Sequence, residues 1–522
     1  MTLAAPPKAE FVADRLAHWA ETCPDTEAWA YGQRAWTYRE WYERVRRLAG
    51  ALSALGVGHG GRVAFLDKNH PACLEVSLGA GLLGAVNAVV NWRLAGDELD
   101  YVINDSGATV LFVGAELLPS IEAIRPRLTS VRTVIVVGGE QDGYQRLLAD
   151  ADPVDRQPEV GQDDLWLVMY SSGTTGRPKG VMLSHRNIVD HTVNVAPLLP
   201  FEPGDRNLVA MPLFHVGGTC YALFGLWSGA PSTMTREPEP KALFAAFAAG
   251  CTHAFLVPAV ISAVFAAGEQ AVAALGGLKY LIYGAAPMPL PLLRKALAAW
   301  PDLNLVQVYG QTELAGVIST LTAQAHRDAG RPERLSSAGT LLQGADLRVV
   351  DPVSGDDVQE GQPGEFWFRS SQRMLGYLNR REDTAASVTE DGWLRTGDIG
   401  HVDDGGFLFL SDRLKDMIIS GGENIYSPEI ERVLVEHPAV AEVAVIGVPD
   451  DHWGESVKAV VALDPGAETT AEELIAHARG HLAGYKVPRT IDFVDALPRN
   501  PSGKILKRSL REPYWAGRDR QI

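Results

Sequence analysis

The chain has 522 residues, of which 46% are apolar and 21% are charged, an ordinary composition for a soluble globular protein. It carries 47 Lys and Arg against 64 Asp and Glu. The net charge of −17 argues against nucleic acid as a partner and against a general attraction to anionic membranes, because both depend on basic residues. Chains of this length usually form several domains, and they bury enough surface to fold without disulfides or a structural metal.

The first third of the chain alternates short β-branched runs with longer helical patterns. The runs cover residues 63–66, 88–90, 110–113 and 134–137, and the alternation resumes at 253–257, 279–283 and 304–308. Alternating strands and helices predict parallel sheets with helices on both faces. We therefore expect an α/β fold whose large N-terminal domain contains two parallel-type sheets.

Residues 243–268 carry no formal charge and are long enough to span a bilayer, but Gly250, Thr252, His253 and Pro258 interrupt them. We interpret this stretch as a helix, a buried strand and a second helix. Residues 1–15 contain charges and no apolar segment, so a secretory signal is not expected. The four cysteines are widely spaced without a Cys-x-x-Cys pair, which suits a reducing cytoplasm and gives no zinc site.

The pattern changes after Gly344. Strands at 345–350, 365–369 and 407–410, separated by Gly and Asp turns, predict a small antiparallel β subdomain. Past Arg413, strands at 441–448 and 457–463 and an amphipathic helix at 471–482 predict a small α+β domain. The expected division is therefore into domains 1–413 and 414–522.

The segment 170–180, Tyr-Ser-Ser-Gly-Thr-Thr-Gly-Arg-Pro-Lys-Gly, follows a run at 165–169 that is typical of a buried strand. Its small residues let backbone N–H groups approach an anion, its hydroxyls add donors, and Lys179 adds positive charge. It does not fit the Walker A pattern. We predict a phosphate-binding loop.

This loop and the segments that follow it resemble the motifs of the acyl-adenylate-forming superfamily, which contains acyl-CoA synthetases, adenylation domains and firefly-type luciferases. The resemblance runs from about Glu10 to Arg511. The similar segments, in the family's order, are the acyl-pocket segment 211–215, the adenine-binding segment 283–287, the adenylate motif 309–313, the ribose-binding segment 393–398, the interdomain hinge 412–416 and the catalytic-lysine loop 500–504.

The resemblance implies a set of nucleotide-binding and thiol-channel residues in this chain. Those implied for the phosphates, the adenine and the ribose are Ser171, Ser172, Gly173, Thr174, Thr175, Lys179, Gly284, Ala285, Ala286, Gln307, Val308, Tyr309, Asp398 and Arg413. It also implies that Lys415 is the hinge of a mobile C-terminal domain and that Gly421 and Gly422 let the backbone approach a thiol channel.

The resemblance further implies the catalytic groups. Thr312 would contact the α-phosphate and Glu313 would hold Mg²⁺, an ion that prefers hard oxygen ligands. His215 would border the acyl carboxylate and gate the thiol. Lys504 would be the movable cation that stabilises the transition state of adenylation, although a lysine in such a turn would by itself be read as solvated.

Two positions bear on the acyl pocket. Val308 stands where family members often carry Gly, so its side chain would reshape the pocket. Gly310 is expected to leave room for an acyl chain or ring.

The sequence thus predicts a cytoplasmic, ATP-dependent acid–thiol ligase, similar to fatty acyl-CoA synthetases and hydroxycinnamate-type CoA ligases, with ATP, Mg²⁺ and coenzyme A as cofactor and co-substrates. An enzyme that loads a carrier protein or activates an unusual acid is the alternative, and a non-catalytic adenylate-binding protein and a luciferase-like oxygenase are more distant ones. The acid itself, a homodimer and a carrier-protein partner are left open.

Overall fold

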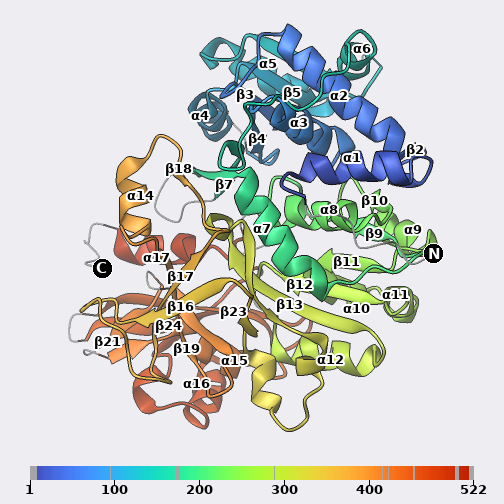
Figure 1. Cartoon of the computed structure of the whole chain (residues 1–522). Coiled ribbons are helices and arrows are strands. Elements are labelled where there is room, and N and C mark those ends of the chain that lie inside the picture. The colour runs from blue at the N-terminus through green and yellow to red at the C-terminus, as the bar shows by residue number, and fades with distance from the viewer. Residues whose placement is uncertain are drawn as a thin grey trace.

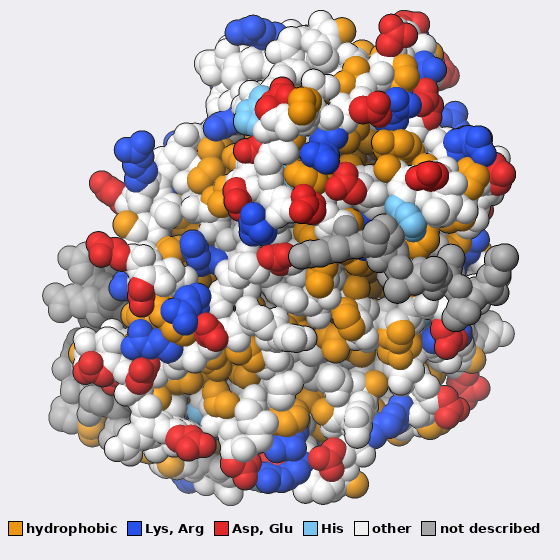
Figure 2. Space-filling model, viewed as in Figure 1, with side chains coloured by type: hydrophobic (Ala, Val, Ile, Leu, Met, Phe, Trp, Pro, Cys, Tyr) orange, Lys and Arg blue, Asp and Glu red, His pale blue; other side chains and the backbone are white. Residues whose placement is uncertain are grey.

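The computed structural model describes residues 9–94, 96–140, 142–171, 177–286, 288–413, 416–420, 423–450, 453–499 and 505–516. N-terminal elements gather at the top of Figure 1 and C-terminal elements at the lower left. On the face that Figure 2 shows, acidic and basic side chains are interspersed over the described surface, and neither sign gathers into one patch there. No described helix is both long enough and apolar enough to cross a membrane.

The first sheet has seven strands and a parallel centre. Its strands are, in spatial order, β18 (Gly376–Tyr377), β8 (Lys179–Ser184), β7 (Leu165–Ser171), β4 (Val86–Val90), β3 (Arg62–Leu66), β5 (Val110–Gly114) and β6 (Thr133–Val137). The strands from β7 to β6 run parallel, while β8 and β18 are antiparallel to their neighbours. The β-branched runs predicted as strands at 63–66, 88–90, 110–113 and 134–137 are confirmed.

The second sheet has nine strands and contains the other predicted parallel strands. Its order is β15 (Thr340–Leu341), β14 (Gly316–Leu321), β13 (Asn304–Gln311), β12 (Tyr280–Gly284), β11 (His253–Leu256), β9 (Asn207–Val209), β10 (Ser232–Met234), β1 (Glu27–Tyr31) and β2 (Arg34–Thr37). The strands from β13 to β1 are parallel, and β14, β15 and β2 are antiparallel to their neighbours, with β15 and β2 at the edges.

Helices cover both sheets. The uncharged stretch 243–268 is a helix, a buried strand and a helix (α9, β11 and α10), as predicted. The helices of the N-terminal part are α1 (Val12–Thr22), α2 (Tyr38–Ala54), α3 (Pro71–Leu82), α4 (Gly96–Ser106), α5 (Leu118–Ile124), α6 (Gly143–Ala149), α7 (His185–Val195), α8 (Val216–Ser228), α9 (Pro240–Ala248), α10 (Pro258–Ala266), α11 (Glu269–Leu275), α12 (Leu290–Ala299), α13 (Ala323–His326) and α14 (Arg381–Ser387).

Strand periodicity separates the two faces of the nine-stranded sheet. Leu281 and Tyr283 of β12 face one apolar cluster together with residues of α9, α10 and α12. Ile282 faces a second cluster on the opposite side, which includes residues of α7 and α8. α7 crosses the space between the two sheets (Figure 1) and contacts β8 of one and β14 of the other. Helix α8 is apolar on nearly all sides and is buried. It contributes Tyr221 and Phe224 to the second cluster and also contacts β14, the strand that follows the adenylate motif.

The antiparallel subdomain is a four-stranded sheet of β16 (Ala345–Val350), β17 (Gly364–Ser370), β19 (Leu394–Val402) and β20 (Leu408–Arg413). The C-terminal region forms its own α+β core, as predicted. It contains β21 (Ile418–Ser420), β22 (Glu423–Ile425), β23 (Val440–Asp450), β24 (Gly454–Leu463), β25 (Thr490–Phe493), α15 (Ser427–Val435), α16 (Ala471–Arg479) and α17 (Lys507–Trp515). The division after residue 413 stays a prediction, because residues 414 and 415 lie outside the described ranges.

Candidate active site

The adenylate motif ends β13 and enters a tight turn. Thr312–Leu314 form the 3₁₀ turn η4, and Ala315 follows in the left-handed region with φ 54°. A non-glycine residue in this region costs about 1–3 kcal/mol and persists only where its surroundings hold it. Here the thiol of Cys220 lies 3.2 Å from the Ala315 carbonyl oxygen, and the Met374 N–H donates to the Glu313 carbonyl oxygen at 2.8 Å.

Two further side chains hold the strand that leaves this turn. Nε2 of the buried His191 accepts the Val317 N–H at 3.0 Å. Burial lowers the pKa of His191 to about 3, so its ring is neutral and can accept. The amide of Gln372 donates to the Val317 carbonyl at 2.9 Å and to the Leu314 carbonyl at 3.3 Å. The turn that carries Glu313 is therefore fixed from α7, from α8 and from the segment after β17.

The Glu313 side chain is a buried carboxylate with a phenol for a partner. It is 9% exposed, and Oε1 accepts a hydrogen bond of 2.8 Å from the Tyr377 hydroxyl. Burial, and then the nearby carboxylate, raise the pKa of Tyr377, so this hydroxyl remains a donor. In the described part of the chain no Lys, Arg or His forms an ion pair with Glu313. A buried carboxylate without a cation fits a metal-ligating role.

The described ends of the predicted phosphate loop lie beside this pair. Ser171 ends β7 and Lys179 begins β8, directly opposite it in the hairpin. Nζ of Lys179 bonds Oδ1 of Asp383 at 2.6 Å and stands 5.0 Å from the centre of the Tyr377 ring. The lysine lowers the pKa of Asp383, so this is a charged pair. Ser172, Gly173, Thr174 and Thr175 lie outside the described residues.

The predicted adenine and ribose residues meet across two sheets. The Tyr309 hydroxyl donates to Oδ2 of Asp398 at 2.6 Å, although 89 residues separate them in sequence. Asp398 is nearly fully buried, and its backbone N–H donates to Thr396 Oγ1 at 3.0 Å. Arg413 pairs with Asp398 across β19 and β20 in the backbone register. Its side chain is not among the described features.

The ends of β12 and β13 are closely packed. Gly284 is level with Val308, and a Cβ at Gly284 would lie 2.3 Å from the Val308 carbonyl oxygen, so a larger residue does not fit there. Ala285 has φ 61° and is exposed, Ala286 beside it is half-buried, and the Gln307 carbonyl accepts from the Thr320 hydroxyl at 2.8 Å. The strained backbone thus occurs where the resemblance puts the adenine.

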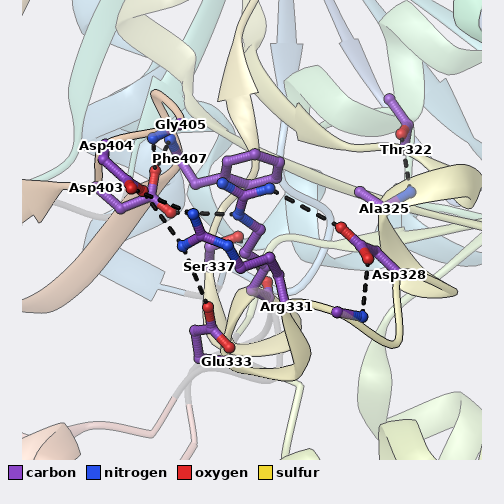
Figure 3. A network of polar contacts seen from close by, with 12 residues as sticks. Thr322, Ala325, Asp328, Arg331, Glu333, Ser337, Asp403, Asp404, Gly405 and Phe407 are labelled. Atoms are coloured by element: carbon purple, nitrogen blue, oxygen red, sulfur yellow. Dashed lines mark hydrogen bonds and ion pairs between the residues drawn. The ribbon is translucent and has the colours of Figure 1, made fainter.

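A polar network anchors the sheet that carries Asp398 (Figure 3). Arg334 donates to Asp403 at 3.2 Å and stacks on Phe407 at 4.0 Å, while Arg331 pairs with Asp404 at 3.2 Å. Asp403 and Phe407 belong to the turn between β19 and β20, whereas both arginines belong to the loop that follows α13. The network therefore links the four-stranded sheet that carries Asp398 to the segment between β14 and β15 of the nine-stranded sheet.

The remaining predicted residues have mixed outcomes. Half-buried His215 precedes α8 as its N-cap residue, with its ring 4.5 Å from that of Phe214. Thr312 is half-buried at the start of η4. The residues predicted for the hinge, the thiol channel and the mobile cation, which are Lys415, Gly421, Gly422 and Lys504, lie outside the described ranges.

The expectation that Gly310 leaves room for the acid is wrong. A Cβ at Gly310 would lie 1.8 Å from the Gly316 carbonyl oxygen and 3.0 Å from Cα of Val317. Both atoms belong to the backbone of β14, which pairs with β13 through an irregular register at this point. The glycine is therefore required by the close approach of two strands.

Sequence reasoning missed Tyr377, Asp383, Gln372 and His191. Each reaches the motifs from a distant part of the chain, and none belongs to a recognisable pattern. Only the fold reveals that they support Glu313 and Lys179.

Comparisons with known proteins agree with this fold. Residues 16–378 match the family described as AMP-binding enzyme, and residues 429–504 match the AMP-binding enzyme C-terminal domain. A feruloyl-CoA synthase of an Amycolatopsis species is 42% identical over 95% of this chain and 97% of that protein. The fatty acid–[acyl-carrier-protein] ligase ScoC of Streptomyces coeruleorubidus is 33% identical over 99% of both chains.

Among solved structures, the ATP-bound MatB from Rhodopseudomonas palustris superposes with a TM-score of 0.88 at 29% identity, over 96% of this chain and 99% of that one. The fold, the order of the motifs and the matched residues lead to one conclusion. The chain belongs to the AMP-binding enzyme family, with both the large N-terminal and the small C-terminal part of that family.

Proposed function

We propose that the chain is an AMP-forming acid–thiol ligase. It converts a carboxylic acid and ATP to an acyl adenylate and pyrophosphate, and then the acyl adenylate and coenzyme A to acyl-CoA and AMP. The observation that carries the proposal is the buried Glu313 carboxylate, which has a phenol partner and no cationic partner among the described residues. It stands beside the ends of the phosphate loop, where a nucleotide with its metal ion would supply the missing positive charge.

The nucleotide end of the site is preorganised. Adenine lies against Tyr309 at the ends of β12 and β13, and Asp398 accepts hydrogen bonds from the ribose hydroxyls. Because the Tyr309 hydroxyl already donates to Asp398, each of the two groups orients the other before ATP arrives. Groups that are already aligned need no reorganisation when charge develops.

Adenylation builds negative charge on the α-phosphate and on the departing pyrophosphate, so catalysis is mainly positioning and electrostatic stabilisation. Glu313 would hold Mg²⁺, which would supply positive charge against this developing negative charge. Thr312 and Ser171 add hydroxyl donors near the phosphates. Lys179 adds a cation whose position is set by Asp383.

The C-terminal part supplies the proposed moving groups. Lys504 is the cation that stabilises adenylation, Lys415 is the hinge, and Gly421 and Gly422 border the thiol. His215, in the N-terminal part before α8, borders the acyl carboxylate and gates the thiol. Lys504→Ala should slow adenylation on the order of 10²- to 10³-fold and retain much of the thioester formation from supplied acyl adenylate. Equal losses in both half-reactions would contradict a role in adenylation alone.

The relatives indicate which acids and which second acceptor to test. The relatives named above include a feruloyl-CoA synthase and a ligase of a fatty acid to a carrier protein. Aryl and fatty acids are therefore both candidate substrates. A carrier protein is the second candidate acceptor.

The test is pyrophosphate release from ATP and Mg²⁺ with fatty, aryl and amino acids, with and without coenzyme A. We expect release only when an acid is present, and acyl-CoA as the product once coenzyme A is added. Glu313→Gln should lose most of this release, whereas Glu202→Gln, at a side chain that is 74% exposed, should retain it. Release that does not depend on the acid, or equal activity of the two variants, would contradict the proposal.

A further inference from the structure

Helix α8 carries a buried phenol whose hydroxyl is unpaired. Tyr221 is 1% exposed, and its oxygen has no hydrogen-bond partner within the described chain. An unpaired buried hydroxyl costs about 1–3 kcal/mol, and the large majority of buried side-chain polar atoms are paired. Phenylalanine would fill almost the same volume without this cost. The hydroxyl therefore suits a partner that comes from outside the chain.

The phenol lies on the face of the nine-stranded sheet that leads to the adenylate motif. Its ring packs edge-on against Phe255 of β11, with the ring centroids 5.7 Å apart. Phe255 is level with Ile282 of β12, which is level with Val306 of β13. Two residues further along the same face, or roughly 7 Å by the rise of a strand, Gly284 and Val308 lie side by side at the carboxyl ends.

This arrangement gives the acid a direction. Val308 is followed at once by the adenylate motif, so an acid activated beside Thr312 would have the rest of the molecule next to Val308. An acid that follows this face would then extend along the strands toward Phe255. A cluster of buried apolar side chains lies on this face, and within that cluster Tyr221 carries the one hydroxyl: Val195, Leu199, Met211, Tyr221, Phe224, Phe255, Ile282, Val306, Val308 and Leu342.

We propose that the Tyr221 hydroxyl binds a polar group at the far end of the acid. The substrate class is then a carboxylic acid with a hydroxyl, methoxy or carbonyl substituent distal to its carboxylate. This inference rests on the acid–thiol ligase activity proposed above. A phenol can donate a hydrogen bond to such a group and can also accept one from a hydroxyl. Burial holds the pKa of Tyr221 well above its usual value, so the group is a neutral hydroxyl at physiological pH.

The Tyr221 hydroxyl should also make the site prefer acids that carry a distal polar group over unsubstituted acids. An unsubstituted acid would leave the Tyr221 hydroxyl buried and unpaired, whereas a substituted acid would pair it. Sites built to pair a substrate hydroxyl reject the analogue that lacks it, while purely apolar pockets discriminate weakly. Selectivity between two acids that differ in one hydroxyl therefore reports on this contact.

The experiment compares wild type with Tyr221→Phe on two matched pairs of acids, 4-hydroxycinnamate with cinnamate and 10-hydroxydecanoate with decanoate. The readout is kcat/KM for pyrophosphate release. We expect wild type to prefer the hydroxylated member of at least one pair by about 10- to 100-fold. In Tyr221→Phe this preference should shrink to within about 3-fold, with kcat/KM on the unsubstituted acid retained or raised.

Tyr38→Phe is the matched control. The Tyr38 hydroxyl is also buried and without a described partner, but it lies at the start of α2 next to Trp19, so its removal should leave the preference unchanged. Without ligands, Tyr221→Phe should melt at the wild-type temperature or above, because it loses an unpaired hydroxyl. The rise in melting temperature that the hydroxylated acid gives wild type in the presence of ATP should shrink in this variant.

The outcomes separate this inference from the function on which it rests. If acids release pyrophosphate but wild type shows no preference, or Tyr221→Phe lowers both members of a pair equally, the distal contact is wrong and the ligase activity stands. A lower melting temperature of unliganded Tyr221→Phe would show that the hydroxyl has a structural role, which also overturns the inference. Failure of every acid to release pyrophosphate would overturn both proposals.

Discussion

Glu313 shows how one residue gains its role from a neighbour that is remote in sequence. In the proposed mechanism Glu313 would hold Mg²⁺, and a carboxylate that rotates freely would face the ion in only some of its positions. The hydrogen bond from Tyr377 to Oε1 removes that freedom and leaves Oε2 to bind. We therefore expect the hydroxyl of Tyr377 to act as a positioning group whose effect appears in the metal dependence of the reaction.

Removing that hydroxyl tests this role. We predict that Tyr377→Phe slows adenylation about 10-fold and raises the Mg²⁺ concentration needed for half-maximal rate, because the loss of one hydrogen bond to a charged group is worth about 1.5–3 kcal/mol. The measurement is pyrophosphate release against Mg²⁺ at fixed ATP. Tyr144→Phe removes a similar tyrosine–glutamate bond, to Glu75, in the seven-stranded sheet region, and should leave the Mg²⁺ curve unchanged. Identical curves for all three proteins would rule out the positioning role.

Gly310 shows the opposite case, a residue whose role is purely backbone. We predict that Gly310→Ala loses activity on short and long acids alike and lowers the free energy of unfolding by roughly 1–3 kcal/mol, because its Cβ would overlap the Gly316 carbonyl oxygen. Thermal melting and kcat/KM across acids of two to twelve carbons provide the measurements. Gly58→Ala, where a Cβ meets nothing within 4 Å, is the control. A selective loss on long acids would restore the pocket interpretation.

At the scale of elements, the hairpin formed by β19 and β20 depends on its anchor. Arg334 is the central cation, with a side chain only 14% exposed, and Asp403 is 17% exposed. Burial alone would raise the pKa of Asp403, but N–H donors from Phe407 and Gly405 together with Arg334 hold it below its usual value. The ionised Asp403 carboxylate therefore holds the turn between β19 and β20 through its bonds to Gly405, Phe407 and Arg334.

Breaking this anchor should loosen the strand that carries Asp398. We predict that Arg334→Leu raises KM for ATP about 3- to 10-fold with a smaller effect on kcat, since losing one partner of a partly buried pair costs on the order of 1–3 kcal/mol. Arg331→Leu is the control within the same network, because Arg331 is 44% and Asp404 71% exposed, and exposed pairs contribute little. Steady-state kinetics with varied ATP distinguish the two variants. Equal KM values for ATP in both would contradict the role of Arg334 in anchoring the β19–β20 hairpin.

The elements that could be predicted from the sequence are those with a strong local pattern. The β-branched runs that form β3, β5, β6 and β12 are strands, and the alternating residues of β16 and β17 form the antiparallel subdomain. The strands β9 and β10 have only three residues each, too few to show a period. The hairpin of β1 and β2 was also missed, since it completes a sheet whose other strands come much later in the chain.

The same division applies to the site. Asp398, Tyr309 and Glu313 belong to contiguous motifs, so the sequence can name them as candidates, and the structure brings Tyr309 and Asp398 into contact. The supporting residues could not be predicted, because Tyr377 reaches Glu313 across 64 residues and Asp383 reaches Lys179 across 204. The free volume beside a glycine could not be predicted either, because it depends on the fold. Gly310 has no side chain, yet the backbone of β14 fills the volume beside it.

At the scale of the whole molecule, the fold buries several histidine side chains, and burial favours their neutral form. Burial lowers the pKa of His70 and His326 to about 4 and that of His185 and His191 to about 3. In the unfolded chain a histidine has a pKa near 6.5. Below about pH 6.5 the unfolded state therefore binds more protons than the folded state, and the stability of the fold falls as the pH decreases.

We predict that the melting temperature is nearly constant above pH 7 and falls steadily between about pH 6.5 and 4, where each buried histidine contributes up to about 1.4 kcal/mol per pH unit. His191→Gln should flatten this curve, because glutamine can still accept the Val317 N–H but does not take up a proton. His59→Gln is the control, since the His59 side chain is 45% exposed and pairs with Asp164 at the surface. Thermal melting from pH 8 to 4.5 gives the curves for the three proteins. If all three have the same slope below pH 6.5, protonation of other groups governs acid unfolding, and the buried neutral state of His191 does not contribute to it.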